Sequence, residues 1–139
     1  MMQRPDVSSA GRTILVTGAS SGIGKVVCDL LAEAGHHVYG ASRTAPSDPG
    51  SWSPLSLDVT DDDAVTEAVA TVIDARGNLD SLVHCAGISV AGAIEDVSID
   101  EAKRQFDTNY FGAVRMTRAV LPAMRARGRG KIIIIGSIG

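Results

Sequence analysis

The sequence predicts an α/β domain built on a doubly wound parallel sheet, with helices on both faces of the sheet. Two features of the chain support this. Short apolar runs of strand length alternate with longer segments whose apolar residues recur at the helical spacing i, i+3, i+4, i+7. Stretches rich in Gly, Pro or Ser separate several of these segments. Strands that alternate with helices form right-handed βαβ units, and such units assemble a parallel sheet between two helical layers.

Composition and charge limit the class of protein. The chain has 139 residues, of which 45% are hydrophobic and 21% are charged, as in a globular protein of one domain. Its net charge of −3 provides no basic field for nucleic acid or an anionic membrane. No apolar stretch approaches the roughly 20 residues that cross a bilayer, and the N-terminus lacks the apolar core of a secretory signal. We therefore expect a cytoplasmic protein with no nucleic-acid partner and no membrane partner.

The first strand and helix follow residues 1–12, which we expect to be a flexible N-terminal segment ahead of a domain at 13–139. Residues 13–18, "TILVTG", form a short apolar run closed by Gly, as expected for a strand buried on both faces. The apolar residues that follow have the spacing of one helix face, and Gly35 ends that helix. These residues are Ile23, Val26, Val27, Leu30, Leu31 and Ala34.

The second and third strands are expected at 37–42, "HVYGAS", and at 54–59, "PLSLDV", with a surface loop rich in Pro, Gly and Ser between them. Thr60 is the expected cap of the next helix, and three aspartates occupy its first turn, where the helix dipole favours carboxylates. The apolar face of this helix is Ala64, Val65, Ala68, Val69, Val72 and Ile73.

The fourth strand is expected at 81–87, "SLVHCAG". Ser98 and Glu101 have the spacing of a capping box, which predicts the start of a short helix. A longer helix is expected from about 108 to 127, and "RGRG" then turns the chain into a fifth strand, "KIIIIG" at 131–136.

A glycine-rich loop, "TGASSGIG" at 17–24, joins the first strand to the first helix. Glycine tolerates the positive φ of a tight bend, its missing side chain lets a phosphate approach the backbone, and a helix N-terminus presents free N–H groups. Such a loop in the first βα unit is typical of the Rossmann-type dinucleotide-binding fold. A P-loop is excluded, because five residues separate Gly18 from Gly24-Lys25 and Val26 follows. We expect a diphosphate to bind at Gly18, Ser20, Ser21, Gly22, Ile23 and Gly24.

The pattern TGxxxGIG after the first strand resembles the fingerprint of the short-chain dehydrogenase/reductase family, in its compact single-domain branch. Further matches occur in the family's order over nearly all of 13–139: "LDV" at 57–59, "HCAG" at 84–87, "NYFG" at 109–112, "LPAM" at 121–124 and "GKIIIIGS" at 130–137. The family usually has two asparagines where this chain has His84 and Cys85.

The resemblance implies several contacts with a nicotinamide dinucleotide. Asp58, followed by Val59, matches the aspartate that touches the adenine ring. Cys85, Ala86 and Gly87, at the end of the fourth predicted strand, match the segment of the family that lines the cofactor site.

The end of the second predicted strand bears on which cofactor binds. NAD-binding domains usually carry an acidic residue there, but no Asp or Glu lies between Glu33 and Asp48, and the strand ends in Ser42 and Arg43. A guanidinium can bind a 2′-phosphate through two hydrogen bonds, whereas a carboxylate would repel it. We therefore expect NADP, bound in part by Ser42 and Arg43. NAD is the alternative, because many NADP-binding relatives have a basic residue where this chain has Ser21.

The resemblance also implies two catalytic residues. Ser137 matches the serine that donates a hydrogen bond to the substrate oxygen, and Asn109 matches the asparagine that holds a water in the proton relay. A serine in a strand-end turn and a helix-capping asparagine are the alternatives. The family's Tyr-x-x-x-Lys pair is absent, because the residues four positions after Tyr39 and Tyr110 are Arg and Val. We therefore expect a C-terminally truncated member of the family, with five strands present and the last strands missing.

These observations predict an NADP-dependent oxidoreductase that moves a hydride between the nicotinamide and a carbonyl or secondary alcohol. A truncated, non-catalytic dinucleotide-binding fragment is the alternative. Val90, Ala91 and Ile94 are expected to line one wall of the substrate pocket, which favours a lipophilic small-molecule substrate. Members of the family are often homo-oligomers that pack the long helix against a neighbour, and we expect the same of the full-length form.

Two further expectations concern the cysteines and histidines. Cys28 and Cys85 lack a C-x-x-C spacing and are expected to be reduced, with a disulfide between them as the minor alternative. His36, His37 and His84 have no carboxylate or thiol at a suitable spacing, so no metal site is expected.

Overall fold

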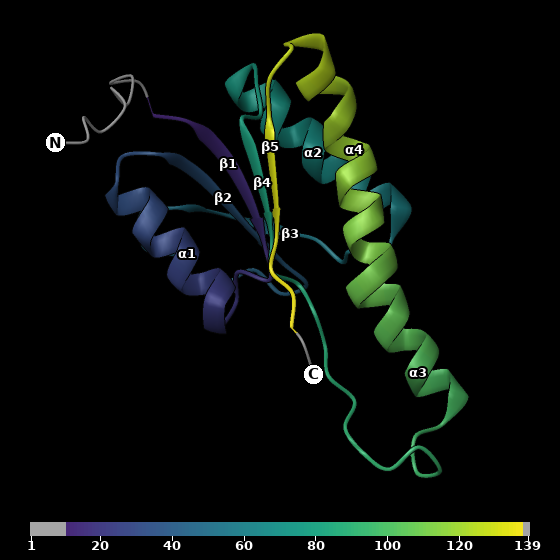
Figure 1. Ribbon diagram of the computed structural model, residues 1–139. Coiled ribbons are helices and arrows are strands. Elements are labelled where there is room, and N and C mark those ends of the chain that lie inside the picture. Colours follow the sequence, from purple (N-terminus) through teal and green to yellow (C-terminus); the bar gives the residue numbers. More distant parts are fainter. Residues whose placement is uncertain (1–10, 138–139) are drawn as a thin grey trace, which may run out of the picture.

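Five parallel strands form one sheet in the computed structural model, which describes residues 11–137 (Figure 1). The strands are β1 Thr13–Thr17, β2 His37–Ser42, β3 Ser53–Ser56, β4 Ser81–His84 and β5 Lys131–Ile134. Their order is β3-β2-β1-β4-β5, so the direction of strand addition reverses between β1 and β4. The predicted parallel sheet is confirmed. Most of the predicted N-terminal segment, residues 1–10, lies outside the described residues.

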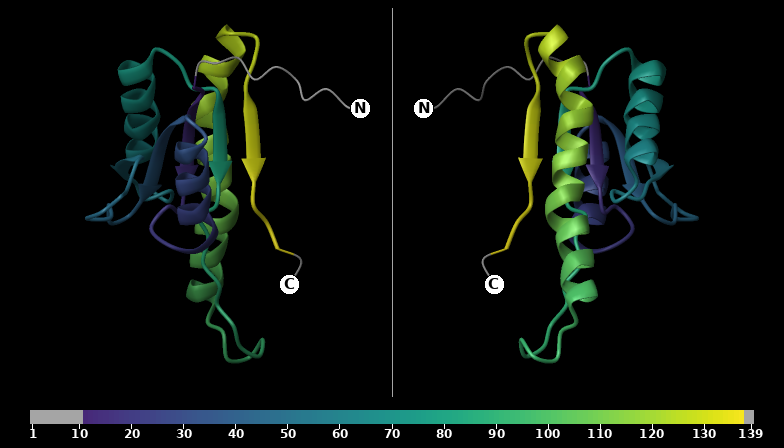
Figure 2. Two further views of the ribbon diagram at one scale, coloured as in Figure 1. Left: turned by 90° about the vertical axis from the view of Figure 1, so that its left-hand side faces the viewer. Right: turned by 90° about the vertical axis from the view of Figure 1, so that its right-hand side faces the viewer.

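Helices cover both faces of this sheet. They are α1 Gly22–Glu33, α2 Asp62–Arg76, α3 Ile99–Phe106, the π-helical turn η1 Asp107–Phe111 and α4 Gly112–Ala126. Helix α1 lies on one face, and α2 and α4 lie on the other (Figure 2). The doubly wound arrangement predicted from the sequence is therefore confirmed.

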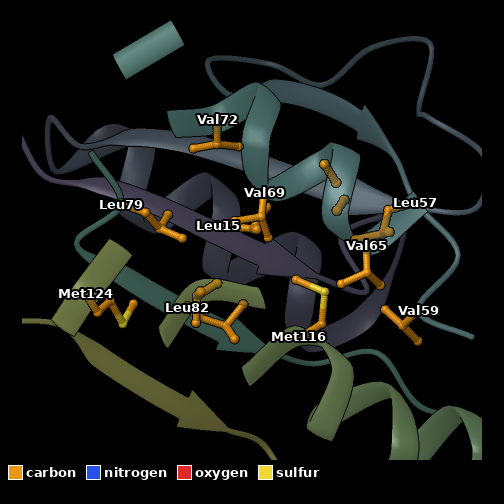
Figure 3. Close-up of a cluster of buried hydrophobic side chains, with 13 residues drawn as sticks. Leu15, Leu57, Val59, Val65, Val69, Val72, Leu79, Leu82, Met116 and Met124 are labelled. Atoms are coloured by element: carbon orange, nitrogen blue, oxygen red, sulfur yellow. The ribbon is translucent and has the colours of Figure 1, made fainter. Parts of the chain in front are cut away.

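Alternate residues of the central strands fill two hydrophobic clusters, one under each helical layer. Leu15 and Leu82 pack with α2 and α4 (Figure 3), whereas Val16 and Val83 pack with α1. This alternation follows from the two-residue period of a strand. Burying a side chain of this size stabilises the fold by about 1.5–3 kcal/mol, so the two clusters fix the register of the strands.

Helix α1 differs from its prediction in which residues contact the sheet. The apolar residues predicted to share one face are divided, because Ile23, Val26 and Leu30 are more than half exposed. Instead, Gly24 and Cys28 are the buried residues of α1. Small residues at the contact let the helix approach the sheet closely, and Val27 and Leu31 pack beside them against the same cluster.

The predicted surface loop between β2 and β3 contains one buried residue, which corrects the prediction there. Trp52 is only 4% exposed, and its ring lies where a side chain at Gly40 would be. The Trp52 Nε1–H donates a hydrogen bond of 2.8 Å to Asp29 Oδ1. The sequence pattern identified the loop but gave no sign that it folds back onto α1.

Two helix starts test the capping predictions. The capping box of Ser98 and Glu101 at the start of α3 is confirmed by both of its hydrogen bonds. The cap of α2 is Asp61, whose side chain accepts a bond from the Ala64 N–H, so the prediction of Thr60 is wrong by one residue. Thr60 is displaced from that role because its N–H and hydroxyl both bond to Asp58.

Strands β3 and β4 end three residues earlier than predicted, at Ser56 and His84. The residues that follow both strands line a cleft at the carboxyl edge of the sheet. Strand β5 is one of the two edge strands within residues 11–137, with β3 at the other edge, and Ile134 of β5 is 54% exposed. The further strand expected beside β5 stays a prediction.

Candidate functional site

A cleft of about 690 Å³ lies at the carboxyl ends of the parallel strands. In open parallel sheets, ligands bind at this edge, where the strand order reverses. Every residue predicted to bind the cofactor lines the cleft: Gly18, Ser20, Ser21, Gly22, Ile23, Gly24, Ser42, Arg43, Asp58, Val59, Cys85, Ala86 and Gly87. Val90, predicted for the substrate wall, also lines the cleft. The tertiary structure adds Ala41, Leu57, Thr60, Ile88, Ser89, Arg104, Thr108 and Ile135.

The glycine loop brings bare backbone to the floor of this cleft. A side chain at Gly24 would overlap the Gly18 carbonyl, and one at Gly18 would lie 2.8 Å from the Ala86 nitrogen. Gly22 has φ of 55°, and a side chain there would meet no other residue. Ser21 precedes α1 without capping it through its side chain, which leaves the first-turn N–H groups for an anion. This loop therefore fits a diphosphate.

Thr17 connects the glycine loop to the segment after β4. Its Oγ1 lies 3.2 Å from the backbone nitrogens of Cys85 and Ala86, which donate to it, and 2.9 Å from His84 Nδ1. His84 is 2% exposed, and burial holds its pKa below the usual 6.5. His84 thus takes part in a strand-to-strand network at the position where the family usually has asparagine, and its buried Nε2 has no hydrogen-bond partner among the described residues.

Asp58 and Arg43 line the end of the cleft beside β2 and β3, opposite the segment that follows β4. The Thr60 N–H and hydroxyl donate to Asp58 Oδ1 at 2.9 and 2.7 Å. These bonds, followed by the charges of Arg43 and Arg115, outweigh burial and hold the pKa of Asp58 below its usual value. The carboxylate is therefore ionised at neutral pH and can accept a hydrogen bond from an adenine amino group. Arg43 follows directly after β2 and places a cation on the same side of the cleft.

Two amides on the α3–η1 segment hold the loop after β4. Asn109 Oδ1 accepts from the Ile88 N–H at 2.8 Å, and Asn109 Nδ2 donates to the Ile88 carbonyl at 2.7 Å. One helical turn earlier, Gln105 Oε1 accepts from the Val90 N–H at 2.7 Å. Both polar groups of the Asn109 side chain are thus used to position Ile88, and the relay role of Asn109 stays a prediction. Sequence reasoning missed Gln105, although its i, i+4 spacing from Asn109 places both on one helix face.

Ser137 lies just beyond the lining of the cleft. Ile135, two residues earlier, belongs to the lining, while Ser137 and Asn109 do not. The structure therefore places the predicted catalytic serine next to the cleft, after the end of β5. Its catalytic role stays a prediction.

The cysteines are both free and lie on or near the α1 side of the sheet. Burial, followed by the charge of Asp29, raises the pKa of the Cys28 thiol to about 12. Burial also raises the pKa of Cys85, which lines the cleft. Both groups are therefore neutral thiols at pH 7 and act as small apolar side chains.

Residues 11–137 contain neither a cluster of metal-binding side chains nor a membrane-spanning helix. No three His, Cys, Asp or Glu side chains in this part of the chain gather closely enough to hold a metal ion. Nor does this part contain a helix that is both long and apolar enough to span a membrane.

Comparison with known proteins identifies the family. The family model described as short chain dehydrogenase matches residues 12–139. The chain is 47% identical over 126 residues to 3-ketodihydrosphingosine reductase of Bacteroides thetaiotaomicron, covering 91% of this chain and 47% of that protein. It is 34% identical over 146 residues to human retinol dehydrogenase 8, covering 95% of this chain and 46% of that protein.

Solved structures of the family have the same fold. A short-chain dehydrogenase from Streptomyces avermitilis superimposes with a TM-score of 0.85 at 36% identity, over 92% of this chain and 50% of the other. The aldohexose dehydrogenase of Thermoplasma acidophilum gives 0.87 at 31% identity, with the same coverage. The chain spans about half the length of the curated relatives it matches. Its sequence and its fold both show that the chain belongs to the short-chain dehydrogenase family, whose members are oxidoreductases that use nicotinamide dinucleotides.

Proposed function

We propose that the protein is an NADP-dependent oxidoreductase that interconverts a carbonyl group and a secondary alcohol. The cleft carries this proposal, because it combines a bare-backbone loop at a helix N-terminus with Arg43 at its far end. The loop would hold the diphosphate and Asp58 the adenine, while the Arg43 guanidinium would pair with a 2′-phosphate. Membership of the family supports the class of reaction.

The choice of NADP over NAD rests on Arg43 and on the absence of a carboxylate from β2 and the residue after it. Titration calorimetry on this chain should give tighter binding of NADPH than of NADH. Arg43→Ala should remove most of the difference, because it deletes the cation that meets the extra phosphate. Arg76→Ala, at the far end of α2, is the matched control and should keep it. Equal affinities in the unaltered chain would refute the NADP assignment.

When bound, the nicotinamide supplies or accepts the hydride. The chain's own residues shape the site around it. Asn109 and Gln105 hold the Ile88–Val90 wall in place, and the Ser137 hydroxyl is proposed to donate a hydrogen bond to the substrate oxygen. Neither tyrosine of the chain is followed four positions later by lysine, so no Tyr–Lys pair is available to transfer the proton.

This missing pair supports a second candidate function for the chain as given, namely dinucleotide binding without turnover. The two candidates differ in one measurement. The chain should bind NADPH, while oxidation of NADPH followed at 340 nm with a ketone stays at background. Turnover typical of a reductase, at about 1 s⁻¹ or faster, would contradict the binding-only function.

The substrate is proposed to be a lipophilic ketone. Ile88, Val90 and Ile135 contribute apolar surface to the cleft, and a relative 47% identical to this chain is a 3-ketodihydrosphingosine reductase. That long-chain ketone is the first compound to test, with a short polar ketone as the control. Of the three residues predicted to line the wall, Val90 lines the cleft, whereas Ala91 and Ile94 are not among its lining residues and Ile94 is 89% exposed.

A homo-oligomer is also proposed, on the evidence of the long helix. Phe106, Tyr110 and Phe111 are at least half exposed on α3 and η1, which is a large apolar area for a solvent-facing surface. Light scattering during size exclusion should show a dimer or larger species. Phe106→Ser together with Tyr110→Ser should shift it toward the monomer, and a monomer in the unaltered protein would contradict this proposal.

A further inference from the structure

Arg115 of α4 connects two places that are far apart in the sequence: residues 59–62, at the start of α2, and Asp107, at the start of η1. Its Nε lies 2.6 Å from Asp62 Oδ1, in the first turn of α2. One Nη donates to Asp107 Oδ1 at 2.7 Å, and the other donates to the backbone carbonyls of Asp107 and Val59 at 3.2 and 3.3 Å. The side chain is only 23% exposed. A planar fork of donors suits such a set of acceptors, whereas the single ammonium of lysine does not.

The Val59 carbonyl belongs to the wall of the cleft where adenine is proposed to bind. Asp58, Val59 and Thr60 all line this wall, and Asp58 is bonded to Thr60. The long helix touches the wall directly, because a side chain at Gly112 would lie 2.8 Å from Val59 Cγ2. Arg115 therefore binds the backbone of this wall at Val59 without lining the cleft itself. The side chains of Asp58 and Thr60 are left on the cleft side of the wall.

Through Asp107, Arg115 is also linked to the wall of the cleft that contains Ile88. Asp107 is the first residue of η1, and Asn109 within η1 bonds to both backbone groups of Ile88. A π-helical turn inside a helix is uncommon and occurs often at functional sites. Here the turn lies between Arg115 and Ile88, so one short segment connects the two walls of the cleft.

The separate contacts of Arg115 differ in expected importance. Asp62 is 84% exposed, and an ion pair with so exposed a partner adds little to stability. The Val59 carbonyl loses a charged donor if the guanidinium is removed, and a partly buried acceptor without a partner is costly. The Asp107 carbonyl keeps the hydrogen bond from the Gly112 N–H. The contact with Val59 should therefore dominate.

We propose that Arg115 is a positioning residue that fixes the 58–60 wall for the adenosine half of the cofactor, and that it couples this wall to Ile88 through η1. The proposal rests on the proposed function, since it assumes that a dinucleotide occupies the cleft. Arg115 itself lies behind the wall and makes no contact with the ligand.

The test measures binding of two probes to this chain by titration calorimetry: NADPH, and 2′,5′-ADP, which contains only the adenosine half. Arg115→Met should weaken both by about tenfold, the effect of one unsatisfied polar group. Arg115→Lys should recover only part of the loss, and Asp62→Asn should have little effect. Arg118→Met, one turn along on the exposed part of α4, is the matched control and should bind as the unaltered chain does.

Amide hydrogen exchange gives a second readout that a general loss of stability would not reproduce. Arg115→Met should speed exchange at residues 58–64 while leaving the Cys85 and Ala86 amides, which bond to Thr17, as protected as before. Unchanged affinity for both probes, or exchange that rises equally at both places, would overturn the positioning role. Failure of the unaltered chain to bind either probe would overturn the proposed function, and this inference with it.

Discussion

Thr17 Oγ1 and His84 Nδ1 lie 2.9 Å apart at the carboxyl ends of the neighbouring strands β1 and β4. The same oxygen accepts hydrogen bonds from the N–H groups of Cys85 and Ala86. Its single hydrogen is therefore the one that points to His84, which makes Nδ1 an acceptor. We assign the ring proton to Nε2, so the network requires a neutral imidazole.

This network predicts a pH dependence of stability. Burial lowers the pKa of His84 in the folded state below its usual 6.5. Above pH 6.5 the ring is neutral in both states; as the pH falls below 6.5 the unfolded chain binds the proton first, so the free energy of unfolding decreases until the folded pKa is reached. Urea unfolding between pH 7.5 and 5 should show this decrease.

His84→Asn introduces the residue that the family usually has and should flatten the decrease, because asparagine does not titrate. His37→Asn, at the exposed start of β2, is the control and should keep the slope of the unaltered chain. If His84→Asn keeps the full slope, the neutral imidazole is not its source.

The close contact between Gly24 and the Gly18 carbonyl predicts that adding one methyl group at Gly24 reduces both stability and cofactor binding. Gly24→Ala places a Cβ on the Gly18 carbonyl, so the loop must move away from the helix N-terminus. We expect a loss of about 1–3 kcal/mol in the free energy of unfolding and loss of measurable NADPH binding. Differential scanning fluorimetry with and without NADPH checks both.

Gly128 supplies the control for that substitution. It has φ of 67° and open space around it, and it follows α4 far from the cleft, so Gly128→Asn should bind NADPH normally. NADPH affinity that survives in Gly24→Ala would show that the loop does not hold the diphosphate.

Gln105 is expected to fix the position of Val90 independently of Asn109. Gln105→Met removes the acceptor for the Val90 N–H and should speed amide exchange at Val90 while Ile88 stays protected. Gln105→Glu keeps an oxygen at the same place and should restore protection. Lys103→Met, an exposed change on the same helix, is the control. If the Val90 amide exchanges at the same rate in the unaltered chain and in all three variants, Gln105 does not hold Val90 in place.

Asp80 is expected to make the fold sensitive to acid. Burial opposes its charge, but the Thr13 N–H at 2.8 Å and Arg127 at 3.0 Å outweigh burial and lower the pKa of Asp80 below its usual 3.8. The stabilisation is thus complete above pH 3.8 and is lost as the pH falls through the lower folded value.

Asp80→Asn should therefore destabilise the chain at pH 7 by about 1–2 kcal/mol and remove part of the loss below pH 4, as measured by urea unfolding. Asp74→Asn, an exposed substitution on α2, is the control and should leave the acid profile unchanged. A profile for Asp80→Asn that parallels the unaltered chain at every pH would contradict this role.

The sequence by itself determined the architecture and many of the residues that line the cleft. Strand and helix periods differ, and glycine is required where a bend or a close approach leaves no room for a side chain, so both signals are local. The glycine loop at 17–24 therefore predicted a site for a diphosphate, and Arg43 at a strand end predicted a partner for a 2′-phosphate. The family's motifs placed Asp58 and Cys85 at the same edge without any knowledge of distances.

Only the tertiary structure decided which polar groups hold that edge in shape. The bonds of Arg115 to Val59 and of Gln105 to Val90 join residues 56 and 15 positions apart. The tertiary structure alone also decided that Trp52 is buried and that Ile23 on α1 is exposed. No period or motif encodes such pairs, because they depend on how closely two elements pack, and that distance is set by side chains distributed over the whole core.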